Sequence, residues 1–131
     1  MTRPIAILAA AGLASSMAIT PAQASSPVEG AEKRQCFWTR SVTNFAAQGD
    51  RLVNVRVGVR DVYQFEMFGP CMDIDWSHQI ALVSRASSSI CTGLDAEIVT
   101  NGPIGEQRCQ VRAMRKLTPV EITALPKRAK P

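Results

Sequence analysis

The chain has 131 residues, of which 46% are hydrophobic and 5% aromatic, and its formal net charge at pH 7 is +4. This length is typical of one compact domain. Nucleic-acid modules combine a basic groove with stacking aromatic residues. The mild charge and the few aromatic residues do not fit that class, so we expect no nucleic-acid partner.

The first 24 residues, MTRPIAILAAAGLASSMAITPAQA, have the order of a cleavable secretory signal. Arg3 precedes an apolar run from Ile5 to Ile19, and small residues follow up to Ala24. The run is about 15 residues long, whereas a spanning helix needs roughly 20. We therefore expect cleavage after Ala24, a periplasmic or secreted protein, and no transmembrane span after processing.

Residues 25–35, SSPVEGAEKRQ, are small, polar and charged, which predicts a flexible lead-in. From Cys36 onward, apolar and polar residues alternate with a period of two, the pattern of strands that bury one face. The expected strands lie at about 39–45 and at 51–58, 61–68, 78–85, 95–100 and 106–114. In the last of these, the alternation places Cys109, Val111 and Ala113 on the buried face.

Turn residues separate these strands. GVRD at 58–61 and NGPIG at 101–105 have the length and composition of hairpin connections. Near the end, Thr118 can cap a short helix that begins at Pro119 and stops before Pro126, with Glu121 three residues after the cap. The basic, proline-flanked residues 126–131 are expected to be disordered.

These elements predict an all-β fold in a single disulfide-stapled domain, residues 36–125. The expected architecture is a small antiparallel β-barrel or sandwich of about six strands, followed by a short C-terminal helical turn. An OB-like barrel is compatible with three meandering strands, an interruption at 69–78, and further strands.

Four cysteines, Cys36, Cys71, Cys91 and Cys109, predict two structural disulfides in an exported chain of this length. There is no Cys-x-x-Cys, so thioredoxin-type redox and zinc-knuckle spacings are missing. Three connectivities are open. The chain-entropy formula gives about 3.3 plus 4.4 kcal/mol for Cys71–Cys91 with Cys36–Cys109, and about 3.8 plus 3.2 for Cys36–Cys71 with Cys91–Cys109. That difference decides nothing, and we prefer the first set because it fastens the first ordered residues to the last strand.

The segment GPCMDIDWSHQI, residues 69–80, holds the only histidine and two aspartates. Asp73, Asp75 and His78 are metal-ligand types, but one histidine is too few for most transition-metal sites. A calcium loop fails as well, because His78 stands where glycine is needed and Ser84 where glutamate is needed. We interpret the segment as a polar corner that follows a disulfide.

No catalytic constellation stands out. There is no Gly-x-Ser-x-Gly elbow, and paired cysteines cannot act as nucleophiles. We therefore assign no catalytic, cofactor-binding or metal-binding residue, and a binding module is favoured over an enzyme. The alternative is a small envelope hydrolase or metal-dependent enzyme centred on Asp73, Asp75 and His78.

Two further features of the sequence are candidates for binding. Trp38 and Trp76 each lie near a cysteine in sequence, and packing against a disulfide is favoured over an exposed stacking platform for a ligand. The last strand carries a basic row that is a candidate anion-binding face, the other interpretation being a solvated edge strand. Its residues are Arg108, Arg112, Arg115 and Lys116.

The chain resembles a family of small exported four-cysteine proteins of Gram-negative bacteria that is classed as a domain of unknown function. The resemblance spans about residues 34–117 and rests on Cys36-Phe37, Asn44-Phe45, VNVRVGVRDVYQFEMFGPC at 53–71, ICTG at 90–93 and RCQV at 108–111. It implies export and disulfides but no activity or catalytic residues. Leu94-Asp95 departs slightly from the family pattern, in which a charged residue often follows CxG.

The sequence thus predicts an exported, non-enzymatic binding or accessory module of the cell envelope. Its partner would be an envelope protein, a glycan or an anionic lipid headgroup, and no cofactor is expected.

Overall fold

A computed structural model describes residues 35–103 and 105–131 of the chain. The predicted signal sequence and nearly all of the predicted lead-in lie outside these residues. The strands are β1 (Phe37–Trp38), β2 (Val42–Gln48), β3 (Leu52–Val57), β4 (Asp61–Met67), β5 (Ile80–Ser84), β6 (Ser89–Ile90), β7 (Ala96–Gly102) and β8 (Gly105–Lys116). One α-helix, α1 (Pro119–Ala124), and three 3₁₀ turns, η1 (Thr39–Ser41), η2 (Gly93–Asp95) and η3 (Lys127–Ala129), complete the described elements.

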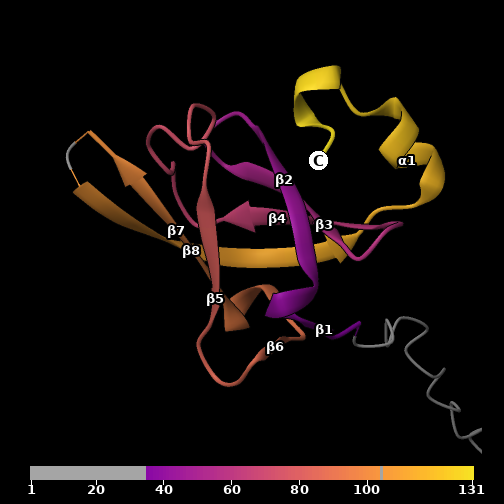
Figure 1. Cartoon of the computed structure of the whole chain (residues 1–131), viewed down its shortest axis with the longest axis horizontal. Coiled ribbons are helices and arrows are strands. Elements are labelled where there is room, and N and C mark those ends of the chain that lie inside the picture. The colour runs from indigo at the N-terminus through magenta and orange to yellow at the C-terminus, as the bar shows by residue number, and fades with distance from the viewer. Residues whose placement is uncertain (1–34, 104) are drawn as a thin grey trace, which may run out of the picture. The chain divides into compact units, whose positions relative to one another are not determined.

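The predicted all-β class is confirmed, and so are the antiparallel arrangement and the six main strands. They form one sheet in the order β2-β3-β4-β8-β7-β5, and β1 pairs with β6 in a small second sheet. Every neighbouring pair is antiparallel. The large sheet curls, so that its edge strands β2 and β5 cross in front of β3, β4 and β8 (Figure 1).

The core lies on the inner face of this curled sheet. Val53 and Val55 of β3 stand opposite Phe65 and Tyr63 of β4, and all four side chains are buried. Further buried residues join this cluster from the other strands and the loops: Phe37, Met67, Cys71, Ile74, Ile90, Ala96, Ile98 and Val111. The period-two alternation seen in the sequence thus corresponds to an inner and an outer face, as pleated strands require.

One residue departs from the predicted alternation in β8. Val111 stands opposite Met67, but Ala113 stands opposite Glu66, so the register shifts between them. Such a bulge adds a residue to one strand and reverses the facing of the residues beyond it. Ala113 is therefore exposed, contrary to the prediction, and Met114 packs against the core in its place.

The prediction of two disulfides is confirmed, but the preferred pairing is wrong. The bonds are Cys36–Cys91, with Cα atoms 4.0 Å apart, and Cys71–Cys109, with Cα atoms 5.8 Å apart. The first follows from the pairing of β1 with β6, which sets Phe37 opposite Ile90 and so brings the preceding and following cysteines together. The second follows from the β4–β8 ladder, which pairs Met67 with Val111 and so brings the chain after β4 close to Cys109.

The C-terminal residues were predicted to be disordered, and this is also wrong. Residues 126–131 include η3, and Ala129 is buried on the outer face of the sheet. The fully buried Asn54 of β3 donates its Nδ2 hydrogen to the main-chain oxygen of Ala129 at 2.8 Å. Arg56, on the same strand, donates from Nε to the main-chain oxygen of Pro131 at 2.9 Å. These bonds hold the tail against β3.

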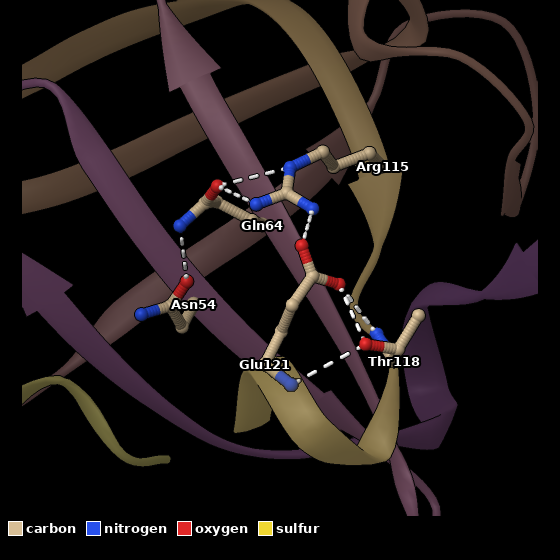
Figure 2. Close-up of polar contacts among 5 residues, drawn as sticks. All are labelled: Asn54, Gln64, Arg115, Thr118 and Glu121. Atoms are coloured by element: carbon tan, nitrogen blue, oxygen red, sulfur yellow. Dashed lines mark hydrogen bonds and ion pairs between the residues drawn. The ribbon is translucent and has the colours of Figure 1, made fainter. Parts of the chain in front are cut away.

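A polar network joins this tail region to the sheet through α1 (Figure 2). The predicted cap is confirmed, since Thr118 and Glu121 form a reciprocal capping box with Pro119 at the first helical position. Arg115 donates to Glu121 Oε1 at 2.6 Å and to Gln64 Oε1 at 2.9 Å. Gln64 in turn donates to Asn54 Oδ1 at 3.2 Å. The network therefore runs from the helix cap to the buried amide that binds the tail.

The same network shifts the titration of Glu121. The backbone N–H of Thr118 donates to its carboxylate, and Arg115 and the Thr118 hydroxyl also bond it. Hydrogen bonds to the charged form favour that form. Together they lower the pKa of Glu121 from 4.5 to about 2.

Among the described residues, no helix has both the length and the apolar character needed to cross a membrane.

Candidate ligand-binding site

The segment that the sequence singles out forms a braced loop between β4 and β5. We call residues 68–79 the stapled loop, because the Cys71–Cys109 disulfide fixes it to β8. Phe68 N donates to the main-chain oxygen of Gln110 at 3.0 Å, and Cys71 N donates to that of Asp50 at 2.7 Å. Ile74 is 0% exposed and belongs to the core cluster. The loop is thus held by the disulfide, by two backbone hydrogen bonds and by the burial of Ile74.

A tight turn follows from this anchoring. Asp73 has φ 59°, in the left-handed region that aspartate tolerates better than most residues. The main-chain oxygen of Asp73 accepts from Trp76 N at 3.1 Å and from Ser77 Oγ at 3.0 Å. With Ile74 directed inward, this turn leaves Asp75 and Trp76 exposed.

Trp76 is 76% exposed, so its predicted packing against a disulfide is wrong. Trp38 is also half exposed, at 50%, and the Arg40 guanidinium lies 5.3 Å from the centre of its ring. The indole of Trp76 is exposed, as the less favoured sequence interpretation requires. Its side chain stands on a loop whose neighbouring residues are fixed in place.

Three open grooves meet at the stapled loop, and His78 lines all of them. The hairpin groove, about 930 Å³, separates the loop from the end of the β7–β8 hairpin. The tail groove, about 570 Å³, lies between the loop, β2 and the C-terminal residues. The edge groove, about 660 Å³, lies between the sheet edges β2 and β5. Trp76 lines both the hairpin groove and the tail groove.

The three candidate metal or catalytic residues do not share one groove. Asp73 lines the hairpin groove with His78, whereas Asp75 lines the tail groove with His78. Within residues 35–103 and 105–131, no group of three histidine, cysteine, aspartate or glutamate side chains is placed to hold a metal ion. His78 therefore shares one groove with Asp73 and another with Asp75, and the three side chains do not line a common groove.

The basic row of β8 is balanced by acidic partners. Lys116 Nζ lies 2.9 Å from Asp61, Arg115 lies 2.6 Å from Glu121, and Arg112 pairs with Glu66. Arg108 lies 2.8 Å from Glu106 and 3.8 Å from Glu97. The hydrogen bond to Asp61 raises the pKa of Lys116, which is the expected direction for a cation beside a carboxylate. Neutralised charges of this kind give the candidate anion-binding face little net attraction for an anion.

The hairpin end is the part of the site that sequence reasoning missed. Asn101, Gly102 and Pro103 line the same groove as Trp76, although they lie about 25 residues further along the chain. The sequence does indicate a hairpin there. Its position beside the stapled loop depends on the β4–β8 and β7–β8 registers, which fix both segments to β8.

The model of one protein family, described as Family of unknown function (DUF6491), matches residues 1–130. No curated protein and no solved structure matches the chain.

Proposed function

Since the chain belongs to this family of unknown function, its own geometry has to indicate its role, and we propose that it is an exported, non-enzymatic binding module of the cell envelope. The stapled loop is the surface that contacts the ligand. The ligand is a component of the envelope: a protein, a glycan or a lipid headgroup.

The observation that most strongly supports this binding function is the exposure of Trp76 on a fixed loop. A tryptophan that is 76% exposed leaves most of a large apolar surface in water. Tryptophan is among the residues that contribute most to binding energy when a partner covers them. Because the disulfide and Ile74 fix its neighbours, little conformational freedom of the loop backbone is lost on binding, which improves affinity.

Export is supported by two independent features. The first 24 residues have the order of a secretory signal, and both disulfides are of the kind that persists in oxidising compartments. Intact mass of the protein recovered from the periplasm tests this directly. We expect a chain that begins at Ser25 and takes up no thiol-alkylating reagent under denaturing, non-reducing conditions. A full-length mass, or alkylated cysteines, would contradict export with two disulfides.

Binding is favoured over catalysis because of how the polar residues are distributed. Asp73 and Asp75 lie in different grooves on the two sides of His78. General acid–base or metal chemistry needs its groups to converge on one reacting atom. A recognition surface, in contrast, can use polar side chains spread along its length.

The proposal is tested by measuring which envelope component the immobilised protein retains. The wild type is compared with Trp76→Ala and with Trp38→Ala, which removes the other exposed indole and serves as the matched control. We expect the wild type and Trp38→Ala to retain the same envelope component and Trp76→Ala to lose it. Equal retention by all three proteins, or no retention by any of them, would overturn the proposal.

A further inference from the structure

We infer that the hairpin groove binds an uncharged saccharide, with Trp76 stacking against one sugar ring. This inference rests on the proposed function and names its ligand class. It follows from the shape of the groove, the chemistry of its lining and the charges that line it.

The groove is formed by two segments that approach closely. A Cβ atom at Gly102 would lie 3.5 Å from Asp73 Oδ2, which is ordinary van der Waals contact. The hairpin end therefore lies beside the stapled loop, and glycine at this position leaves space that a side chain would occupy. The volume of about 930 Å³ lies within the range of small-molecule sites, roughly 300–1,000 Å³.

The lining combines one large aromatic surface with several hydrogen-bonding groups. Asp73 supplies a carboxylate, Gln79 and Asn101 supply amides, and His78 supplies an imidazole. All four residues are exposed, so their polar atoms are accessible to a ligand. An aromatic ring beside such groups matches a sugar, which has an apolar face of C–H groups and a rim of hydroxyls.

The charges of the lining disfavour an anionic ligand here. Among residues 35–103 and 105–131, no lysine or arginine lines the hairpin groove, and the carboxylate of Asp73 would repel a phosphate or a uronic acid. The amides of Gln79 and Asn101 each donate and accept hydrogen bonds, as hydroxyl groups also do. An uncharged oligosaccharide meets both conditions.

The experiment uses an array of uncharged oligosaccharides, namely chito-, malto- and cello-oligomers, together with their sulfated and carboxylated counterparts. The best probe is then titrated into Trp38→Phe, in which Trp76 is the only tryptophan and reports its own environment by fluorescence. We expect a saturable change in emission. We also expect affinity, measured by titration calorimetry because Trp76→Ala lacks the reporting indole, to fall at least tenfold in Trp76→Ala, Asn101→Ala and Gly102→Val, the last of which places a side chain in the groove.

The possible outcomes separate this inference from the proposed function. Saturable binding of an uncharged oligomer that these three variants weaken, and that Trp38→Phe retains, supports the inference. Preference for the charged counterparts overturns it. It is also overturned if no oligosaccharide binds while Trp76→Ala still loses the envelope component, and the proposed function then stands. If Trp76→Ala changes neither measurement, both fail.

Discussion

The stapled loop and the C-terminal segment, residues 117–131, both pack against the curled sheet, but they are held by different means. The loop is fixed by the Cys71–Cys109 disulfide and the buried Ile74, and it leaves Trp76 in solvent. The C-terminal segment continues directly from β8, carries no disulfide, and is held against β3 by hydrogen bonds from Asn54 and Arg56. A loop anchored by so few residues can expose the rest. We infer that the loop serves recognition and the C-terminal segment serves to cover the sheet.

Removal of the loop disulfide is the strongest test of this contrast. Cys71→Ser with Cys109→Ser should lower the free energy of unfolding by about 4 kcal/mol, and Cys36→Ser with Cys91→Ser by a similar amount, since their sequence separations of 38 and 55 give close loop-closure entropies. The two pairs differ in local effect. Urea unfolding measures the free energy of unfolding. Amide hydrogen exchange should show faster exchange of residues 69–79 only in the variant that lacks Cys71–Cys109. Equal protection of the loop in both variants would contradict its dependence on Cys71–Cys109.

Within the loop, Ile74 and Trp76 should respond in opposite ways. Ile74→Ala should cost about 3 kcal/mol, because a fully buried aliphatic side chain leaves a cavity. Trp76→Ala should change stability by less than about 0.5 kcal/mol, because its side chain is mostly in water. Denaturant melts of the two variants give both values. A large loss of stability in Trp76→Ala would mean that the indole is a packing residue and would remove the basis of the proposed binding site.

This pair also shows what sequence reasoning could and could not predict. The strands were predictable because alternation is a local pattern, and the cap at Thr118 was predictable for the same reason. The inward residue of the loop was not, because size favours a tryptophan in the core, whereas the turn at Asp73 places Ile74 there instead. The backbone geometry of the turn decides which side chain points inward, and the amino-acid composition does not show that geometry.

The disulfide pairing and the tail were missed for a related reason. The Cys36–Cys91 bond depends on two-residue strands too short to recognise in a sequence. The tail depends on Asn54 and Arg56, each 75 residues away from its bonding partner. The sequence of residues 126–131 alone reads as disordered, and the order comes from β3.

The C-terminal segment should loosen when its buried partner is removed. Asn54→Ala takes away the donor to Ala129 and the acceptor for Gln64, leaving a buried carbonyl unpaired. We expect a loss of about 2 kcal/mol, the usual cost of an unsatisfied buried group. Hydrogen exchange should accelerate in residues 126–131 and stay unchanged in the stapled loop. Asn101→Ala, which removes an exposed asparagine, is the control, and an equal loss in that variant would contradict a special role of Asn54.

The smallest expected effect is a pH dependence at the helix cap. The pKa of Glu121 is about 2 in the folded chain against 4.5 as its ordinary value, so its ionised form stabilises the fold above about pH 4.5, and that contribution is lost as the pH falls through 2. Thermal melts from pH 7 to pH 2 should show a constant difference between the wild type and Glu121→Gln above about pH 5 and a shrinking difference below it. Arg115→Ala removes one partner of the carboxylate and should move this interval to higher pH. Parallel curves down to pH 2 would show that the C-terminal segment is held by the buried amide of Asn54 without help from the cap.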